Sequence, residues 1–323
     1  MSEHQSAPKR VAMTSGEVSS LITSFLGSVS RNSAEAYRRD LEAFARHVDA
    51  SEPAAAIGRL LSLSPGAAHT LATDYRSAMT IARCAPTTIN RRLATLRSLV
   101  SVARVTGHVS WQLQIKNVRA DTYRDTRGPQ SHCVAALLAV AAQQAPMKAA
   151  RDIALVRLLH DLALRRGEVV SLDLADFDMA ARRLWVTGKG RTEKTPLTLP
   201  GPTLAAISAW ISSRGEIPGP LFTTFDPTRK GNLSRRLTGQ GLWTIIKALG
   251  KAASVTNARP HGLRHAGITR GLDLTGGDVR AVQRFSRHAN LQTLITYDDN
   301  RTDLGGKVAA LVAGAVDVGM VGE

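Results

Sequence analysis

The chain of 323 residues contains 42 Lys and Arg against 26 Asp and Glu, a formal net charge of +16. This excess indicates a polyanionic partner, with nucleic acid first and an anionic membrane surface second. The sequence has no apolar run of about 18 residues and no signal-peptide pattern, which argues against a membrane protein, and its two cysteines are too few for a disulfide framework.

The first predicted domain is a small helical bundle over residues 15–117, preceded by a polar, disordered tail at 1–14. Helices are expected over Ser15–Leu26 and from Ser33, which we interpret as an N-cap. The apolar face of the second helix consists of Tyr37, Leu41, Phe44 and Val48. Further helices are expected over Leu71–Arg83 and from Pro86, and the core stripe of the latter consists of Leu93, Leu96, Val100 and Ala103.

Arginines lie on the outer faces of these helices, and a single one is as readily a solvated side chain as a phosphate contact. Residues 1–130 carry 17 basic and 10 acidic side chains, a net +7, and residues 131–323 carry 25 and 16, a net +9. Because both domains share the positive charge, phosphate contact is the favoured interpretation. The arginines expected to contact a nucleic acid are Arg38, Arg39, Arg91, Arg92, Arg97, Arg235 and Arg236.

A polar linker is predicted at 118–130, with Gly128-Pro129 as its turn, and the second domain spans 131–323. Helices are expected from Ser131, over 150–162, over 234–253, from Gly262 and over 278–285. Short strands at 184–186 and 195–199 flank a cation-rich hairpin at 187–191. The predicted fold class is therefore mainly α with a small antiparallel β-sheet, a helical domain followed by a mixed α/β domain.

Several basic residues of the second domain, and one tyrosine near its end, lie at breaks in the pattern rather than on regular helix faces. In chain order they are Arg165, Lys189, His261, Arg264, His288 and Tyr297. Taken singly, each is more often structural: a half-buried tyrosine, a core histidine, a solvated lysine, or an i, i+3 ion pair between Arg165 and Glu168. Together they form the order Arg, Lys, His-x-x-Arg, His, Tyr, which independent structural roles do not explain.

This order resembles the tyrosine recombinase, or phage integrase, family over most of the chain. The stretches that carry the resemblance are Thr87–Leu93, Leu164–Glu168, Lys189 between two glycines, His261–Arg264 and His288 with Tyr297. It implies a helical core-binding domain, a catalytic domain with a C-terminal exchange helix, and cleavage and rejoining of double-stranded DNA through a 3′-phosphotyrosine. It also implies a homotetramer on two DNA sites in integration, excision or resolution, with an accessory recombinase or a DNA-bending protein as a further partner.

The resemblance also assigns roles to the residues. Tyr297 is the nucleophile, Arg165 and Arg264 hold the phosphate, and His288 hydrogen-bonds it. His261 is the general acid or base for the phenol and Lys189 protonates the leaving 5′-oxygen. Supporting roles fall to Glu168, which orients Arg165, and to His265. No metal or other cofactor is implied, because arginines supply the electrostatics, and the expected location is the cytoplasm, at the nucleoid.

Two residues depart from the family pattern, which usually has glycine before Leu164 and before His288. This chain has Ala163 and Arg287 there. Neither change removes a reacting group, but Arg287 adds either a phosphate contact or an altered local turn. Two alternatives stay open: relaxation of DNA in the manner of a type IB topoisomerase, and a recombinase-derived DNA-binding protein without catalysis.

Overall fold

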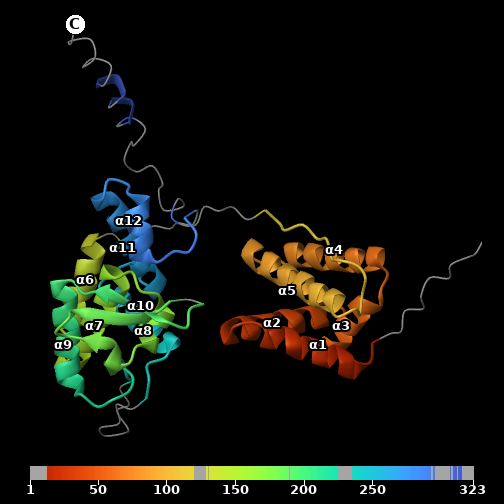
Figure 1. Cartoon of the computed structure of the whole chain (residues 1–323), viewed down its shortest axis with the longest axis horizontal. Coiled ribbons are helices and arrows are strands. Elements are labelled where there is room, and N and C mark those ends of the chain that lie inside the picture. Colours follow the sequence, from red (N-terminus) through yellow and green to blue (C-terminus); the bar gives the residue numbers. More distant parts are fainter. Residues whose placement is uncertain are drawn as a thin grey trace, which may run out of the picture. The chain divides into compact units, whose positions relative to one another are not determined.

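The computed structural model describes residues 13–119, 129, 131–188, 190–224, 235–291, 294, 306, 308–310 and 312–314. The chain divides into two compact units, Met1–Asp121 and Thr122–Glu323, whose α-helices are labelled in Figure 1. The predicted fold class, mainly α with a small antiparallel sheet, is confirmed. Most of the predicted tail, most of the linker, Lys189 and Tyr297 lie outside the described residues.

The first unit consists of the helices α1 (Ser15–Gly27), α2 (Arg31–His47), α3 (Pro53–Ser62), α4 (Pro65–Ile81) and α5 (Pro86–Val105). Polar caps fix several of their N-termini. Thr14 and Glu17 form a capping box at α1, and Ser30 accepts a hydrogen bond from the backbone N–H of Ser33 at α2. The prediction that Ser33 caps α2 is therefore wrong, since this residue lies in the first turn of the helix.

All five helices contribute buried side chains to the core of the first unit. The predicted stripe of α5 is fully buried, and so are Leu41 and Phe44 of α2. Helix α3, which the sequence analysis missed, closes this core with Ile57 and Leu60. Beyond α5 the chain stays attached to the unit, because Asn90 exchanges two hydrogen bonds with the backbone of Val118, at 2.8 and 3.0 Å.

The second unit contains seven α-helices among its described residues, together with a 3-10 turn and three strands. The helices are α6 (Ser131–Ala142), α7 (Pro146–Asp161), α8 (Arg166–Ser171), α9 (Gly201–Arg214), α10 (Gly239–Ala252), α11 (Pro260–Leu274) and α12 (Val279–Ser286). Helix α7 is the centre of the unit and packs against α6, α9 and α11 (Figure 1). Its buried residues Leu155, Leu158 and Leu159 lie in the main core of the unit.

The strands form an antiparallel sheet in the order β1 (Phe177–Asp178), β2 (Arg183–Thr187) and β3 (Lys194–Thr198), after the 3-10 turn η1 (Leu174–Asp176). Leu184 and Val186 of β2 point into the core, while their neighbours face outward, as expected for a strand with one buried face. The pairing of Thr187 with Lys194 leaves residues 188–193 as the hairpin tip. The hairpin therefore projects the glycines that flank Lys189 beyond the sheet.

Further helix starts differ from the predictions: α7 begins at Pro146 instead of residue 150, and α11 begins at Pro260 instead of Gly262. Helix α4 begins at Pro65 instead of Leu71, because Ser64 caps it through the N–H of Ala67. Helix α10 begins at Gly239 instead of residue 234, because Thr238 is its cap and Arg236 forms a β-bridge with Thr223. Within the described ranges, no helix combines the length and apolar composition needed to cross a membrane.

Candidate active site

Arg165 lies at the N-terminus of α8 and is held there by the next turn. Its Nη1 donates to Oε1 of Glu168 at 2.7 Å, and its backbone N–H donates to Oε2 at 2.8 Å. Burial alone would raise the pKa of Glu168, but the N–H of Arg165 and the charge of Arg287 outweigh it and lower the pKa below its usual range. Glu168 is therefore a buried carboxylate that orients Arg165 from the side facing the protein interior.

Arg264 is the most deeply buried of the predicted phosphate-binding residues, with 1% of its surface exposed. It lies in the second turn of α11, and its guanidinium reaches two other segments of the unit. Nη1 donates to the carbonyl of Ala163, and Nη2 donates to the carbonyl of Ser286 at 2.7 Å. Arg264 thus ties the end of α7 to the end of α12, where His288 follows.

Close packing of α11 on α7 makes this reach possible. A Cβ atom placed on Gly267 would lie 2.2 Å from the carbonyl oxygen of His160, far inside van der Waals contact. Glycine is therefore required where α11 crosses the last turn of α7. The close approach brings Arg264, one turn earlier on α11, to the carbonyl of Ala163.

His288 lies beside Arg264 and is held on both ring nitrogens. Its Nε2 is 3.2 Å from Nη2 of Arg264, and its Nδ1 is 2.9 Å from the hydroxyl of Ser286. Burial, reinforced by the charges of Arg264 and Arg165, lowers the pKa of His288 to about 4. The ring is therefore neutral near pH 7 and can hydrogen-bond a phosphate without carrying charge.

The first two turns of α11 bring together the two remaining predicted histidines. The Nε2 atoms of His261 and His265 are 2.7 Å apart, and their rings meet edge to face with centroids 4.0 Å apart. One of these nitrogens must carry a proton and the other accept it, because two bare nitrogens repel. The structure thus places His265 where it sets the tautomer of His261.

A pocket of about 450 Å³ opens in front of Arg165 and His288. The β2–β3 hairpin contributes Gly188 and Arg191 to its wall, and α12 contributes Arg284. Guanidiniums on several sides make the pocket suited to a phosphate-sized anion. Lys189 itself is not described, but its neighbour Gly188 lies on this wall.

Sequence reasoning missed three residues at this site. Arg191 follows Lys189 in the hairpin that had been noted as rich in cations, so its charge was a usable signal. Arg284 lies in the last turn of α12, four positions before His288, so its charge close to the motif was also a usable signal. Ser286, by contrast, gave no signal, because a serine near a helix end normally marks only a terminus.

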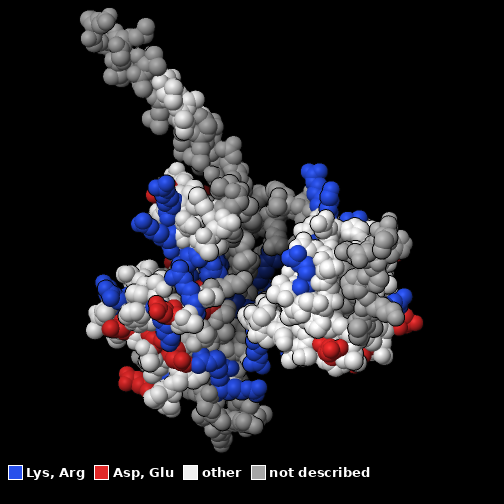
Figure 2. All heavy atoms as spheres, turned by 45° about the vertical axis from the view of Figure 1, so that its right-hand side comes forward, with Lys and Arg blue, Asp and Glu red and all other residues white. Residues whose placement is uncertain are grey.

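The positive charge extends over both units, as Figure 2 shows by the distribution of Lys and Arg side chains. Of the seven arginines expected to contact a nucleic acid, Arg38, Arg91 and Arg235 are exposed, but Arg91 also donates to Asp40 at 2.6 Å. Arg39 is exposed and pairs with Glu35 of its own helix at 3.2 Å.

The other three lie partly buried, with contacts inside their own unit. Arg92 approaches Asp40 at 3.8 Å, and Arg97 donates to the carbonyl of Ile115 at 2.7 Å. Arg236 donates to the carbonyls of Val170 and Leu172, both at 3.0 Å, and pairs with Asp173. Their contacts support structural roles, and the predicted contact of these three arginines with a nucleic acid stays a prediction.

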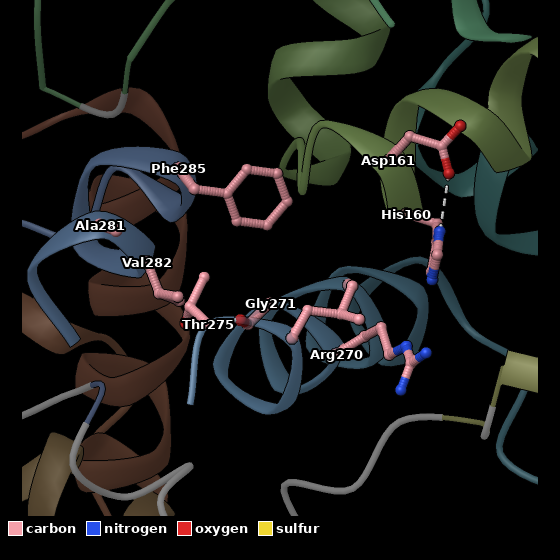
Figure 3. Close-up of a pocket in the computed structure, with 10 residues that line it drawn as sticks. His160, Asp161, Arg270, Gly271, Thr275, Ala281, Val282 and Phe285 are labelled. Carbon is pink, nitrogen blue, oxygen red and sulfur yellow. Dashed lines mark hydrogen bonds and ion pairs between the residues drawn. The ribbon is translucent and has the colours of Figure 1, made fainter. Parts of the chain in front are cut away.

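A second pocket, of about 400 Å³, lies between the end of α7, α11 and α12 (Figure 3). Val282 and Phe285 of α12 line it together with Thr275 and Arg270 of α11, and its surface is mostly apolar. At its edge the Nδ1 atom of His160 lies 2.7 Å from Asp161. The pocket is a recess of the second unit, and none of the four predicted catalytic residues that the structure describes lines it.

Comparisons with known proteins identify the family. Residues 131–303 match the Phage integrase family. A tyrosine recombinase of Synechocystis sp. is 34% identical over 88% of this chain and 91% of its own length. Another tyrosine recombinase, from Synechococcus elongatus, is 37% identical over 86% of this chain and 88% of its own length.

Solved structures agree in fold. The Tn1549 transposon integrase in complex with a circular intermediate DNA is 16% identical, with a TM-score of 0.64 over 92% of this chain and 98% of that one. XerH site-specific recombinase bound to a palindromic difH substrate is 15% identical, with a TM-score of 0.64 over 93% of this chain and 85% of that one. On the family match and the two relatives, this chain belongs to the phage integrase family of tyrosine recombinases.

Proposed function

We propose that this tyrosine recombinase breaks and rejoins double-stranded DNA at Tyr297, with Arg165, Arg264 and His288 holding the scissile phosphate. The observation that carries the proposal is the network around the end of α12. Arg264 contacts His288 directly, and Arg165 and His288 line one pocket. A permanently charged guanidinium binds the non-bridging oxygens of a phosphate and stabilises the charge that they gain in the transition state.

The reaction conserves the phosphodiester. The phenol oxygen of Tyr297 forms a bond to phosphorus as the bond from phosphorus to the 5′-oxygen breaks. His261 receives the phenol proton, and Lys189 donates a proton to the departing 5′-oxygen. The DNA 3′-end stays on the protein as a phosphotyrosine, and attack by a 5′-hydroxyl reverses the same steps. A tyrosine ester retains the bond for rejoining, which hydrolysis by water would lose.

The test is covalent capture. The wild-type chain and Tyr297→Phe are expressed in the native host, which is lysed under denaturing conditions, and DNA attached to the purified protein is sequenced. DNA on the wild type but not on the variant supports the proposal and reveals the target site. Equal recovery from both, or recovery only after chemical crosslinking, would overturn Tyr297 as the nucleophile and favour a DNA-binding protein without catalysis.

The topoisomerase alternative is distinguished by the products. A monomeric relaxing enzyme leaves one DNA molecule with altered supercoiling, whereas a recombinase joins segments of two sites. The similarity to tyrosine recombinases over most of the chain does not favour this alternative. A plasmid carrying two copies of the captured site provides the assay, because recombination changes its restriction pattern and relaxation does not.

We also propose that the chain acts as a homotetramer through its C-terminal segment, the predicted exchange helix. Val308 and Val312, which are four residues apart in helical conformation, are 59% and 62% exposed. An apolar helix face of this kind needs a partner, and a second copy of the chain is the simplest one. Removal of residues 303–323 should then abolish assembly on two sites while single-site DNA binding persists. Unchanged assembly would exclude this role.

A further inference from the structure

Arg287 and Ala163, the two departures from the family pattern, both occupy left-handed backbone. Arg287 ends α12 with φ 56° and ψ 39°, and Ala163 follows α7 with φ 46°. This conformation costs a residue with a Cβ atom about 1–2 kcal/mol, while glycine adopts it freely. The usual glycines therefore have a physical reason, and this chain must stabilise both turns in another way.

The side chain of Arg287 supplies that stabilisation. Nη1 donates to the carbonyls of Leu162 and Phe285, both at 3.1 Å. Nη2 donates to the carbonyl of Ala163 and to Oε2 of Glu168, again at 3.1 Å. Only 16% of the side chain is exposed. The guanidinium thus bridges the ends of α7 and α12 and holds Arg287 in the left-handed conformation.

These contacts connect Arg287 to both arginines of the site. Arg165 donates to the carbonyl of Arg287 at 3.2 Å, and both side chains share the carboxylate of Glu168. Arg264 and Arg287 donate to the same carbonyl, that of Ala163. His288 is the next residue in the chain, so the turn at Arg287 sets the direction of its side chain.

The shared carboxylate also affects charge. Glu168 faces the guanidiniums of Arg165 and Arg287, so a single negative charge is divided between two positive ones. If Arg287 were absent, Glu168 would neutralise Arg165 more completely and weaken its attraction for a phosphate. Arg287 therefore influences both the geometry and the charge of the anion-binding side chains, and it also borders the pocket that they line.

We propose that Arg287 is a positioning residue of the recombination reaction, which fixes Arg165, Arg264 and His288 relative to one another. The effect on rate rests on the function proposed above, whereas the effect on geometry does not. No reacting atom contacts Arg287 in this proposal. Its side chain acts only through Glu168 and through the carbonyls that it holds.

The informative variant is Arg287→Gly, because glycine suits the left-handed backbone and the substitution removes only the side chain. Arg182 offers a matched control. It has φ 54°, its side chain is exposed, and it lies in the turn before β2, at the end of the strand remote from the hairpin tip. Arg287→Lys tests the shape of the side chain, since an ammonium keeps the charge but cannot bridge carbonyls and a carboxylate in one plane.

Nitrogen NMR of the DNA-free proteins tests the geometry. The signals of the His288 ring, assigned by loss in His288→Gln, should shift in Arg287→Gly and stay in place in Arg182→Gly. If the His288 ring signals of a folded Arg287→Gly protein did not shift, the proposal would be overturned, whether or not the wild type cuts DNA. Arg287→Lys gives the same readout if the glycine variant does not fold.

The rate is tested on the duplex recovered by covalent capture. Misplacement of catalytic groups by about 1 Å costs on the order of 100-fold in rate, so single-turnover cleavage by Arg287→Gly should fall by about that factor with little loss of DNA affinity. Arg287→Lys should recover part of the rate, and Arg182→Gly should match the wild type. A shifted His288 ring with an unchanged cleavage rate would overturn the proposal. Absence of cleavage by the wild type would instead count against the function, while the NMR result still decides the geometry.

Discussion

The Nη2 atom of Arg264 lies 3.2 Å from Nε2 of His288, and this contact fixes the state of the histidine. A guanidinium has donors and no acceptor, so Nε2 must accept the hydrogen bond and the ring proton must lie on Nδ1. There it faces the hydroxyl of Ser286 at 2.9 Å, which in turn reaches the carbonyl of Gln283 at 3.4 Å. The same guanidinium opposes a second proton on the ring.

His288 should therefore make the stability of the protein depend on pH in mildly acidic solution. Its pKa is about 4 in the folded protein, whereas an ordinary histidine, as in the unfolded chain, has a pKa of 6.5. Between these values the unfolded chain therefore binds a proton that the folded chain does not. The contribution of His288 to the free energy of unfolding is therefore fully present above pH 6.5, decreases as the pH falls toward 4, and changes no further below pH 4. Urea unfolding across this window should show a weaker pH dependence in His288→Gln, and equal slopes would contradict the assignment.

Glu168→Gln should destabilise the second unit, because two guanidiniums lose their shared carboxylate. Removing one partner from a buried ion pair typically costs about 3–5 kcal/mol. Since the pKa of Glu168 lies below its ordinary 4.5, the stabilisation is present above that value and disappears as the pH falls further. Thermal unfolding should therefore separate the wild type from the variant at pH 7 and bring them together in acid. Glu216→Gln, at an exposed carboxylate, is the control, and its melting temperature should equal that of the wild type at both pH values.

The sequence allowed prediction of the fold class and of the basic residues that the structure places together. Leu93, Leu96, Val100 and Ala103 repeat with the helical period and are all buried, which is the pattern that periodicity detects best. The motif around His261 and Arg264 was recognisable because its order along the chain recurs in a family. Local spacing alone would have left every one of these residues with a structural interpretation.

What the sequence did not reveal depends on contacts between distant segments. Arg287 and Glu168 are 119 positions apart, and their ion pair arises only when α12 meets the start of α8. Arg236 stands in a basic pair with Arg235, yet only its own side chain turns inward to the carbonyls that end α8. Charge alone cannot separate an arginine that caps carbonyls from one that faces solvent, because both carry the same sequence signal.

That difference predicts opposite results for two arginine variants. Arg38 is exposed on α2, so Arg38→Ala should reduce the dependence of DNA affinity on salt by about one phosphate contact and leave the melting temperature unchanged. Arg236→Ala should leave the salt dependence unchanged and lower the melting temperature, because three oxygen atoms at the end of α8 lose their donor. Affinity for a short random-sequence duplex over a range of salt concentrations, paired with thermal unfolding, checks both. A lower salt slope in Arg236→Ala would show that this residue contacts DNA after all.

Gly267 and Gly271 lie one turn apart on α11 and should respond in opposite ways to alanine. A Cβ on Gly267 would meet the carbonyl oxygen of His160 at 2.2 Å, whereas a Cβ on Gly271 has its nearest neighbour, the side chain of Val282, at 3.5 Å. Overpacking costs about 1–3 kcal/mol, and a backbone carbonyl in a helix cannot rotate away. Replacing a helical glycine by alanine in free space is favourable by up to about 1 kcal/mol. Gly267→Ala should therefore lower the free energy of unfolding and Gly271→Ala should maintain or raise it, as urea titrations would measure.

Because the forced shift separates α11 from α7, Gly267→Ala should also slow DNA cleavage by pulling Arg264 away from Ala163. Equal stability of the two variants would mean that the helices do not approach as closely as the site requires.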